Sequence, residues 1–316
     1  FIKDSYVNSS NLDTLLYSEK IRLKFNPMDL WRENYTVKSI EISDGTLKMK
    51  VNEEGEVNYD IFKKVNDSTE TDAFEVNLEE VGFVNFGYAY INHTTNQEYR
   101  TLINTMSLKG AFNSSVFTTK AEADIHVLSA RSGEVTLISN QPSQLDIVVN
   151  VNTDSSVISI PESVIYVSEL PFNFSGEVGP NGFNFNLNGK NLSIKDVANR
   201  LAMTQSDDVK KFEGQGVLKF NLDVDKKTGN KSPIRVNCSF GVKNGNLRIP
   251  SSKIAINKLT VAGFYSNEGG KKKEKLELKK ITFKTKGGPF KGTLLLTQFA
   301  APIFKGNADG LLDLEV

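Results

Sequence analysis

The stretch that decides the fold runs Phe183-Asn-Phe-Asn-Leu-Asn-Gly189, in which apolar residues alternate with asparagine. Successive side chains of a β-strand point to opposite faces, so this pattern gives one apolar and one polar face. The same alternation recurs in Leu218-Lys-Phe-Asn-Leu-Asp-Val224 and in Val236-Asn-Cys-Ser-Phe240. Strands that are apolar on one side only are typical of antiparallel sheets.

Similar alternation extends along most of the 316 residues, for example at Val84, Phe86, Tyr88 and Tyr90. The spacing of these runs predicts on the order of 18 strands. Asn-Gly and Asp-Gly pairs between the runs tolerate the positive φ of tight hairpin turns. The sequence therefore predicts an all-β fold built as an antiparallel meander. Its predicted turns include Ser43-Asp-Gly45, Pro180-Asn-Gly182 and Lys243-Asn-Gly245.

Helical signals are few and short. Residues 11–16 and 27–31 each allow a turn or two, and Pro27 suits the first position of a helix. The strongest candidate spans residues 193–203, where apolar residues recur at helical spacing and Ser193 is the predicted N-cap. We expect an amino-terminal segment at 1–65, a central β segment at 66–190 and a carboxy-terminal β segment at 191–316, or one continuous sheet.

Composition argues against a polyanion-binding protein. Lysine plus arginine and aspartate plus glutamate are equal at 38 each, so no net charge attracts the chain to nucleic acid. The one cysteine, Cys238, has no partner for an intrachain disulfide and lies in an alternating run. We expect it to be a small buried apolar residue rather than a reactive thiol.

The sequence contains no constellation that carries enzyme chemistry. His93 and His126 are far apart and belong to no zinc-binding motif. The chain also lacks a GxSxG elbow and the glycine-rich phosphate loops. Asp223-Val-Asp-Lys-Lys-Thr-Gly229 departs from a calcium loop at its fifth position and its glycine, and indicates a strand ending in a turn. We predict a non-enzymatic protein with no catalytic residue, no metal and no cofactor.

No apolar run reaches the roughly 20 residues that span a bilayer. The chain begins at Phe1 rather than methionine, as it would if an upstream export signal or anchor had been removed. Proteolysis or an engineered start would give the same first residue, so the residues themselves leave an upstream anchor open.

Three stretches resemble the AsmA-like family of bacterial envelope proteins. The first is Ile21-Arg-Leu-Lys-Phe-Asn-Pro-Met-Asp-Leu30, followed by Tyr35-Thr-Val-Lys-Ser-Ile-Glu-Ile-Ser-Asp-Gly-Thr-Leu47 and then by Glu54-Gly-Glu-Val-Asn-Tyr-Asp-Ile61. The second runs from Leu170-Pro-Phe-Asn-Phe-Ser-Gly176 through residues 183–197, and is similar to the family's strand pair ending in a small helix. The third includes Leu259-Thr-Val-Ala-Gly-Phe-Tyr-Ser-Asn267. Together the three stretches cover most of the chain.

The resemblance implies an elongated, curved antiparallel sheet whose apolar groove binds or conducts lipid acyl chains in outer-membrane biogenesis or lipid homeostasis. It also implies a periplasmic location, an anchor in the inner membrane, and a phospholipid or other acyl lipid as partner. The alternation itself is equally compatible with a structural or adhesive β-sandwich domain, whose apolar faces would be packed together. The candidate lipid-contact residues share a face within their own strands; they are Phe183, Phe185, Leu187, Leu218, Phe220, Leu222, Leu294 and Leu296.

Overall fold

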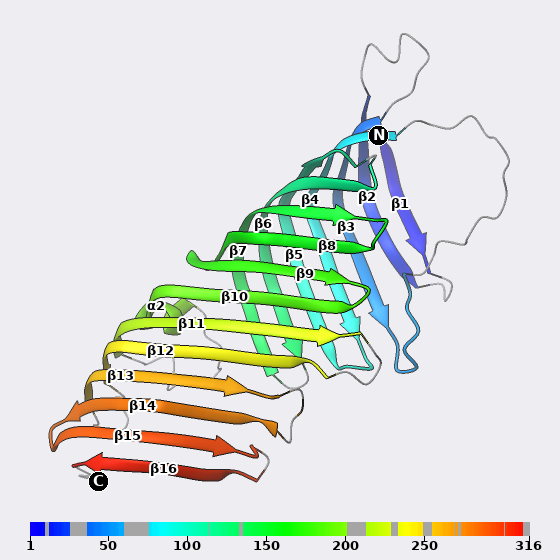
Figure 1. The fold of residues 1–316 in the computed structure, drawn as a ribbon. Helices are drawn as coiled ribbons and strands as arrows, with labels where there is room; N and C mark the ends of the chain where they lie inside the picture. The colour runs from blue at the N-terminus through cyan, green and yellow to red at the C-terminus, as the bar shows by residue number, and fades with distance from the viewer. Residues whose placement is uncertain are drawn as a thin grey trace. The chain divides into compact units, whose positions relative to one another are not determined.

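The computed structural model describes residues 1–9, 13–25, 37–59, 76–112, 114–132, 135–200, 213–228, 233–248, 255–268, 270, 273–299 and 301–311. Within these ranges the chain forms sixteen strands and the helix α2 (Figure 1). The predicted all-β antiparallel class is therefore confirmed. The chain divides into two units, residues 1–154 (unit 1) and residues 155–316 (unit 2).

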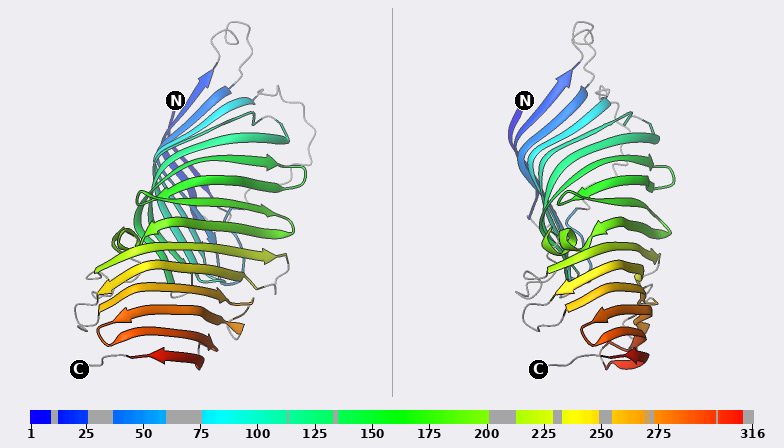
Figure 2. Two further views of the ribbon diagram at one scale, coloured as in Figure 1. Left: turned by 60° about the vertical axis from the view of Figure 1, so that its left-hand side comes forward. Right: turned by 90° about the vertical axis from the view of Figure 1, so that its left-hand side faces the viewer.

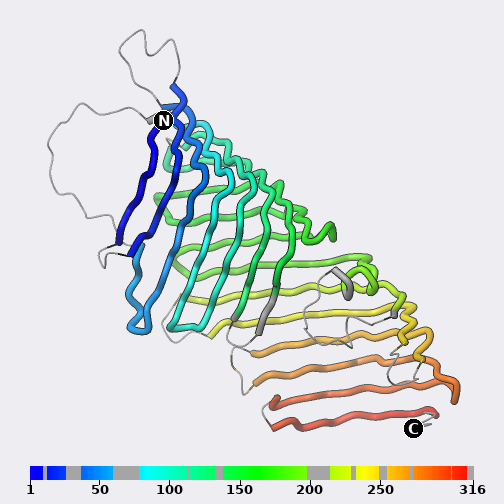
Figure 3. The backbone as a smooth tube through the Cα atoms, turned by 180° about the vertical axis from the view of Figure 1, so that it is seen from behind, coloured from blue at the N-terminus to red at the C-terminus, as the bar shows by residue number. Residues whose placement is uncertain are grey.

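Unit 1 is a sheet whose strands follow the order of the chain (Figures 1 and 3). Its strands are β1 (Ile2–Asn8), β2 (Thr14–Phe25), β3 (Val37–Val51), β4 (Val76–Asn92), β5 (Gln97–Gly110), β6 (Val116–Ser132) and β7 (Val135–Asn152). All described pairs in this unit are antiparallel except β3 with β4, which is parallel. The expectation of a pure meander was wrong here, because residues 52–75 form a connection long enough for a parallel crossover.

The described residues of unit 2 form nine strands, again in chain order. They are β8 (Val157–Val167), β9 (Leu170–Gly179), β10 (Gly182–Ser193), β11 (Glu213–Lys227), β12 (Arg235–Arg248), β13 (Ala255–Ser266), β14 (Lys275–Thr285), β15 (Gly288–Thr297) and β16 (Ile303–Gly310). Every pair of successive strands from β8 to β16 is antiparallel. The predicted turn at Pro180-Asn-Gly182 joins β9 to β10, and Gly182 has a φ of 120°.

Two other predicted turns are wrong. Asp44 lies inside β3 with a φ of 54°, and Asn244 lies inside β12 with a φ of 52°. Aspartate and asparagine tolerate this left-handed conformation. It occurs in irregularities within a strand, such as β-bulges, as well as in hairpin turns. At Asn244 the register between β12 and β13 shifts, as expected of a β-bulge.

The strands of unit 1 bend along their length (Figure 2). Asp44 of β3 and Asn85 of β4 are both left-handed, and the Asn85 amide donates a 2.6 Å hydrogen bond to the Asp44 carboxylate. The kink reverses the alternation, so the rings of Phe83 and Phe86 lie 5.2 Å apart on one face although they are three residues apart. Val84 is consequently exposed, which corrects its predicted place in the run of Phe86, Tyr88 and Tyr90.

Helix α2 (Ile194–Arg200) confirms the strongest helical prediction over its described part. The Ser193 hydroxyl accepts a 3.3 Å hydrogen bond from the backbone N–H of Asp196, as expected of an N-cap. Thr14–Leu16, by contrast, belongs to β2 rather than to a helical turn. The helical prediction at 27–31 lies outside the described residues. No helix in the described part of the chain is long and apolar enough to cross a membrane.

Candidate functional site

The candidate contact residues of β10 and β11 lie together on one face of unit 2. Leu187 is directly opposite Leu222, and Phe220 is directly opposite Gly189. Opposite residues of an antiparallel pair share a face, so the register brings the two sets of candidates together. Phe185 adds to this face from β10 and is opposite Gly176 of β9.

Two cross-strand rows continue this face to β16. The first row consists of Phe174, Leu187, Leu222, Cys238, Tyr265, Leu276, Leu296 and Phe304. The second row consists of Gly189, Phe220, Phe240, Gly263, Leu278, Leu294 and Gly306. The candidates outside the two rows, Phe183, Phe185 and Leu218, lie on the same side of their strands. We call these residues the unit 2 apolar face, and it includes all eight candidates.

Glycines on this face make room for phenylalanine rings. A Cβ atom at Gly176 would lie 2.2 Å from Cδ1 of Phe185, and one at Gly263 would lie 2.4 Å from Cζ of Phe240. Each ring therefore lies over the backbone of the neighbouring strand and covers the glycine. Because the rings lie along the sheet, their flat faces contribute to its surface.

One end of the face is packed core. Leu170, Phe172 and Leu192 are buried, and Val197 of α2 packs against them. Three candidates, Leu187, Leu218 and Phe220, are partly buried against this cluster. The other five candidates are half-buried and lie beyond it: Phe183, Phe185, Leu222, Leu294 and Leu296. The structure thus separates the candidates into a group packed against the buried cluster beside α2 and a group outside it.

Within unit 2 the described strands form a single layer. Each strand contacts its neighbours in the sheet, and β10 and β11 also contact α2. No second sheet of the described unit packs on the apolar face. The neighbouring strands β8 to β16 follow one another side by side in the views of Figures 1 and 2. The described strands of unit 2 are therefore not by themselves a sandwich.

The opposite face of β10 and β11 is polar and internally hydrogen bonded. The Asn186 amide donates to the side chains of Asn221 at 2.9 Å and Asp223 at 2.6 Å. The Arg235 guanidinium donates to the Asp225 carboxylate, with a shortest distance of 2.5 Å. These charged and amide side chains thus bond to one another on this face, although the Asn188 side-chain oxygen is buried without a hydrogen-bond partner.

The two rows contain two ionisable groups, the Cys238 thiol and the Tyr265 phenol. Burial raises the pKa of Cys238, and the nearby Asp223 carboxylate raises it further. Burial also raises the pKa of Tyr265, with a smaller contribution from Glu274. Both groups are therefore neutral near pH 7. The predicted burial of Cys238 is corrected to half-buried, because no second layer of the unit covers it.

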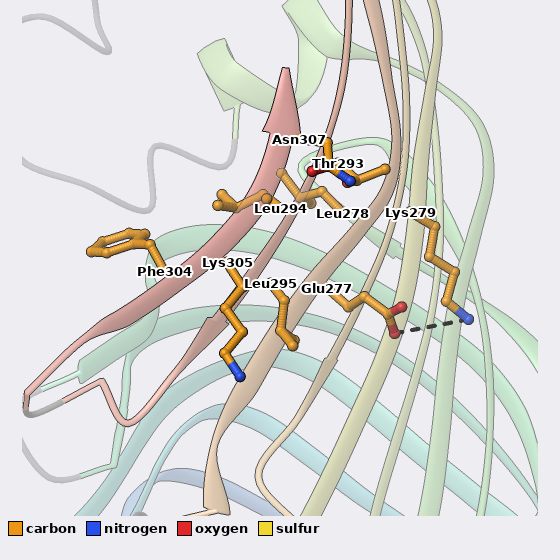
Figure 4. A pocket seen from close by; sticks show the side chains of 10 residues that line it. Glu277, Leu278, Lys279, Thr293, Leu294, Leu295, Phe304, Lys305 and Asn307 are labelled. Carbon is orange, nitrogen blue, oxygen red and sulfur yellow. Dashed lines mark ion pairs between the residues drawn. The ribbon is translucent and has the colours of Figure 1, made fainter. Parts of the chain in front are cut away.

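A shallow hollow of about 760 Å³ lies over β14 to β16. Its apolar lining includes Leu278, Leu294 and Phe304, and the polar part includes Lys305 (Figure 4). Figure 4 shows Phe304 and Lys305 on opposite sides of β16, as alternation requires. Of the eight candidates, Leu294 lines this hollow and Leu296 does not.

Unit 1 has an apolar face of its own, with tyrosines at one end. The rings of Tyr90 and Tyr99 stack with centroids 6.1 Å apart, and the Tyr88 hydroxyl donates to the Met49 sulfur at 3.8 Å. Burial, and secondarily Tyr90, raises the pKa of both Tyr88 and Tyr99. These hydroxyls therefore stay neutral near pH 7.

Sequence reasoning missed the members of the face that connect β11 to β15. Cys238 and Leu276 alternate with polar residues, whereas Gly263 and Tyr265 have the apolar neighbours Ala262 and Phe264. The alternation around Cys238 and Leu276 was recognisable, but the register that aligns all four residues depends on pairing between strands distant in sequence. The described residues contain no group of histidine, cysteine, aspartate and glutamate suited to a metal ion.

A comparison with protein-family models, curated proteins and solved structures finds no match to the chain. The resemblance to the AsmA-like family therefore rests on the sequence motifs alone and stays a prediction.

Proposed function

We propose that this chain is a non-enzymatic, AsmA-like lipid-binding protein whose unit 2 apolar face binds acyl chains. The observation that carries this proposal is an apolar face that continues from β9 to β16 with no second layer of the described unit upon it. Proteins rarely leave a large contiguous apolar surface without a ligand or partner. An acyl chain is the ligand whose chemistry matches a long, uncharged surface.

The dimensions and energetics support the same ligand. Strands in a sheet are about 4.8 Å apart, so the first row from Phe174 to Phe304 extends roughly 34 Å across eight strands. Each methylene removed from water contributes about 0.8 kcal/mol. A chain of a dozen or more methylenes on this face would therefore offset much of the cost of leaving a membrane.

The cellular setting is proposed from the family resemblance. In that setting the chain lies in the periplasm and is attached to the inner membrane through an upstream segment. It binds or conducts phospholipid or another acyl lipid in outer-membrane biogenesis or lipid homeostasis. The alternative of a structural or adhesive sandwich domain requires two sheets packed face to face. Neither unit provides the second sheet among its described strands.

Paired substitutions on single strands test lipid binding. Phe185→Asp and Leu294→Asp place a charge on the apolar face, whereas Asn184→Asp and Thr297→Asp place it on the opposite face of the same strands. We expect the first two variants to bind a fluorescent phospholipid about tenfold less tightly or worse, because the ligand would desolvate the carboxylate. The two controls should bind like the unmodified chain.

Circular dichroism and urea unfolding establish that each variant is folded. Native mass spectrometry of the unmodified chain should show bound phospholipid after exposure to vesicles. An unmodified chain that stays lipid-free and takes up no fluorescent lipid would contradict the proposal, as would equal binding by the apolar-face and control variants.

A further inference from the structure

Lys226 places a positive charge at one end of the unit 2 apolar face. It is directly opposite Phe183 of β10, and opposite residues of an antiparallel pair share a face. The other described residues that strand pairing places on this side of β9 to β16 are uncharged. Glu274 precedes β14, three strands from β11, and its carboxylate accepts a hydrogen bond from the Tyr265 hydroxyl. Lys226 is therefore a cation beside an otherwise apolar surface.

The Lys226 ammonium forms no ion pair with the described part of the chain. The preceding Asp225 points to the opposite face, where the Arg235 guanidinium donates to its carboxylate with a shortest distance of 2.5 Å. Glu177 of β9 also lies on that opposite face. Residues 228–234, which follow β11, contain a lysine but no aspartate or glutamate. The half-buried Lys226 side chain is thus available to an anionic ligand.

The apolar side of β11 has a charged end and a packed end. From Lys226 it continues through Leu222 and Phe220 to Leu218, without a register shift. At about 3.4 Å per residue, this part of the strand is roughly 27 Å long. Phe220 and Leu218 then pack against the buried cluster beside α2. An amphiphile lying along the strand would therefore have its headgroup at Lys226 and its acyl chain directed toward α2.

We propose that the unit 2 apolar face selects amphiphiles with an anionic headgroup, and that Lys226 is the residue that selects them. This inference rests on the proposed lipid binding, to which it adds the headgroup class and the orientation of the acyl chain. A carboxylate or phosphate oxygen accepts charge-assisted hydrogen bonds from an ammonium group. Apolar surroundings exclude part of the water and so strengthen the attraction between the two charges. Fatty acids and acidic phospholipids share this chemistry.

Pairs of ligands that differ in headgroup charge test the selection. One pair is oleate and monoolein, and the other is dioctanoyl phosphatidylglycerol and dioctanoylglycerol. We expect the unmodified chain to bind the anionic member about tenfold more tightly than the neutral one. Displacement of a fluorescent acylglycerol at pH 8 measures the affinities, with each ligand kept below the concentration at which it aggregates. A preference in the first pair alone would indicate a fatty acid, and one in the second pair alone a phospholipid.

Substitutions of Lys226 and its neighbour separate headgroup selection from general lipid binding. Lys226→Met keeps an unbranched side chain without the charge, so it should lose the tenfold preference and bind the neutral ligands as before. Lys226→Arg should retain the preference, and Lys226→Glu should favour oleylamine over oleate. Lys227→Met removes an equal charge on the opposite face of the same strand, and this control should keep the preference.

Added salt provides a test that needs no variant. It should weaken the binding of the anionic ligands to the unmodified chain and should not weaken that of the neutral ligands. Circular dichroism establishes that each variant is folded.

Equal binding of anionic and neutral ligands would overturn the selection by Lys226 and leave the lipid-binding proposal intact. The same holds for a preference that survives in Lys226→Met, or one that Lys227→Met removes as completely. A chain that binds none of the four ligands would overturn both proposals.

Discussion

Each unit contains a glycine that is covered by a phenylalanine ring, but the surroundings of the two differ. The pairs are Gly45 with Phe86 in unit 1 and Gly263 with Phe240 in unit 2. A Cβ at Gly45 would lie 2.3 Å from the backbone oxygen of Tyr17. A Cβ at Gly263 would meet only side-chain atoms among its nearest neighbours. Phe86 is 2% exposed, whereas Phe240 is half-buried.

The difference indicates two uses of the same sequence device. In unit 1 the glycine lets two strands approach closely beside the kink at Asp44 and Asn85, and the ring itself is almost fully buried. In unit 2 the glycine lets a ring lie flat on a face that no second layer of the unit covers. The first pair therefore contributes mainly to stability, and the second mainly to the shape of an accessible surface.

The largest expected effect is at the buried ring. Phe86→Ala should lower the free energy of unfolding by about 4 kcal/mol, because it leaves a cavity in close-packed surroundings. Phe240→Ala should cost roughly half as much, since part of its ring is already in contact with solvent. Urea unfolding of both variants measures the difference, and equal costs would break the distinction between the two pairs.

The glycines should differ in the same direction. Gly45→Ala should destabilise by about 3 kcal/mol, because the new methyl group would collide with backbone that cannot move away. Gly263→Ala should cost about 1 kcal/mol, since the Phe240 ring can turn. Combining Gly263→Ala with Phe240→Leu should recover part of that loss in the same unfolding measurement. A Gly263→Ala variant as unstable as Gly45→Ala would show that the ring is fixed.

The smallest expected effect concerns the kink beside Gly45. Asn85→Gly and Asn85→Ala both remove the hydrogen bond to Asp44, but alanine alone meets the cost of a left-handed backbone. The alanine variant should therefore be about 1 kcal/mol less stable than the glycine variant. Thermal unfolding of the two variants side by side measures this, and equal stability would argue against the left-handed conformation at this residue.

Much of the architecture could be predicted from the sequence. Alternation of the type Phe183, Phe185, Leu187 depends only on neighbouring residues, so it identified the strands and their apolar sides. The cap at Ser193 was also predictable, because its hydrogen bond to Asp196 is local. The positions of Asp44 and Asn244 were recognised as left-handed, but whether such a residue turns the chain or kinks a strand depends on how the flanking strands pair.

The candidate site was predictable only strand by strand. Leu222 and Leu296 belong to one row because four intervening pairings align Cys238, Tyr265 and Leu276 between them. The sequence did not indicate that Leu218 and Phe220 would pack beside α2 while Phe185 and Leu294 would not. That distinction depends on where the helix folds back on the sheet.

The amino-acid sequence by itself determined that this protein is built of strands with one apolar and one polar face, because side-chain alternation is a local property of extended backbone. Only the tertiary structure decided the register that joins those faces, the parallel pairing of β3 with β4, and the single layer within each unit. These features depend on contacts between residues far apart in the chain, which no short stretch of sequence specifies.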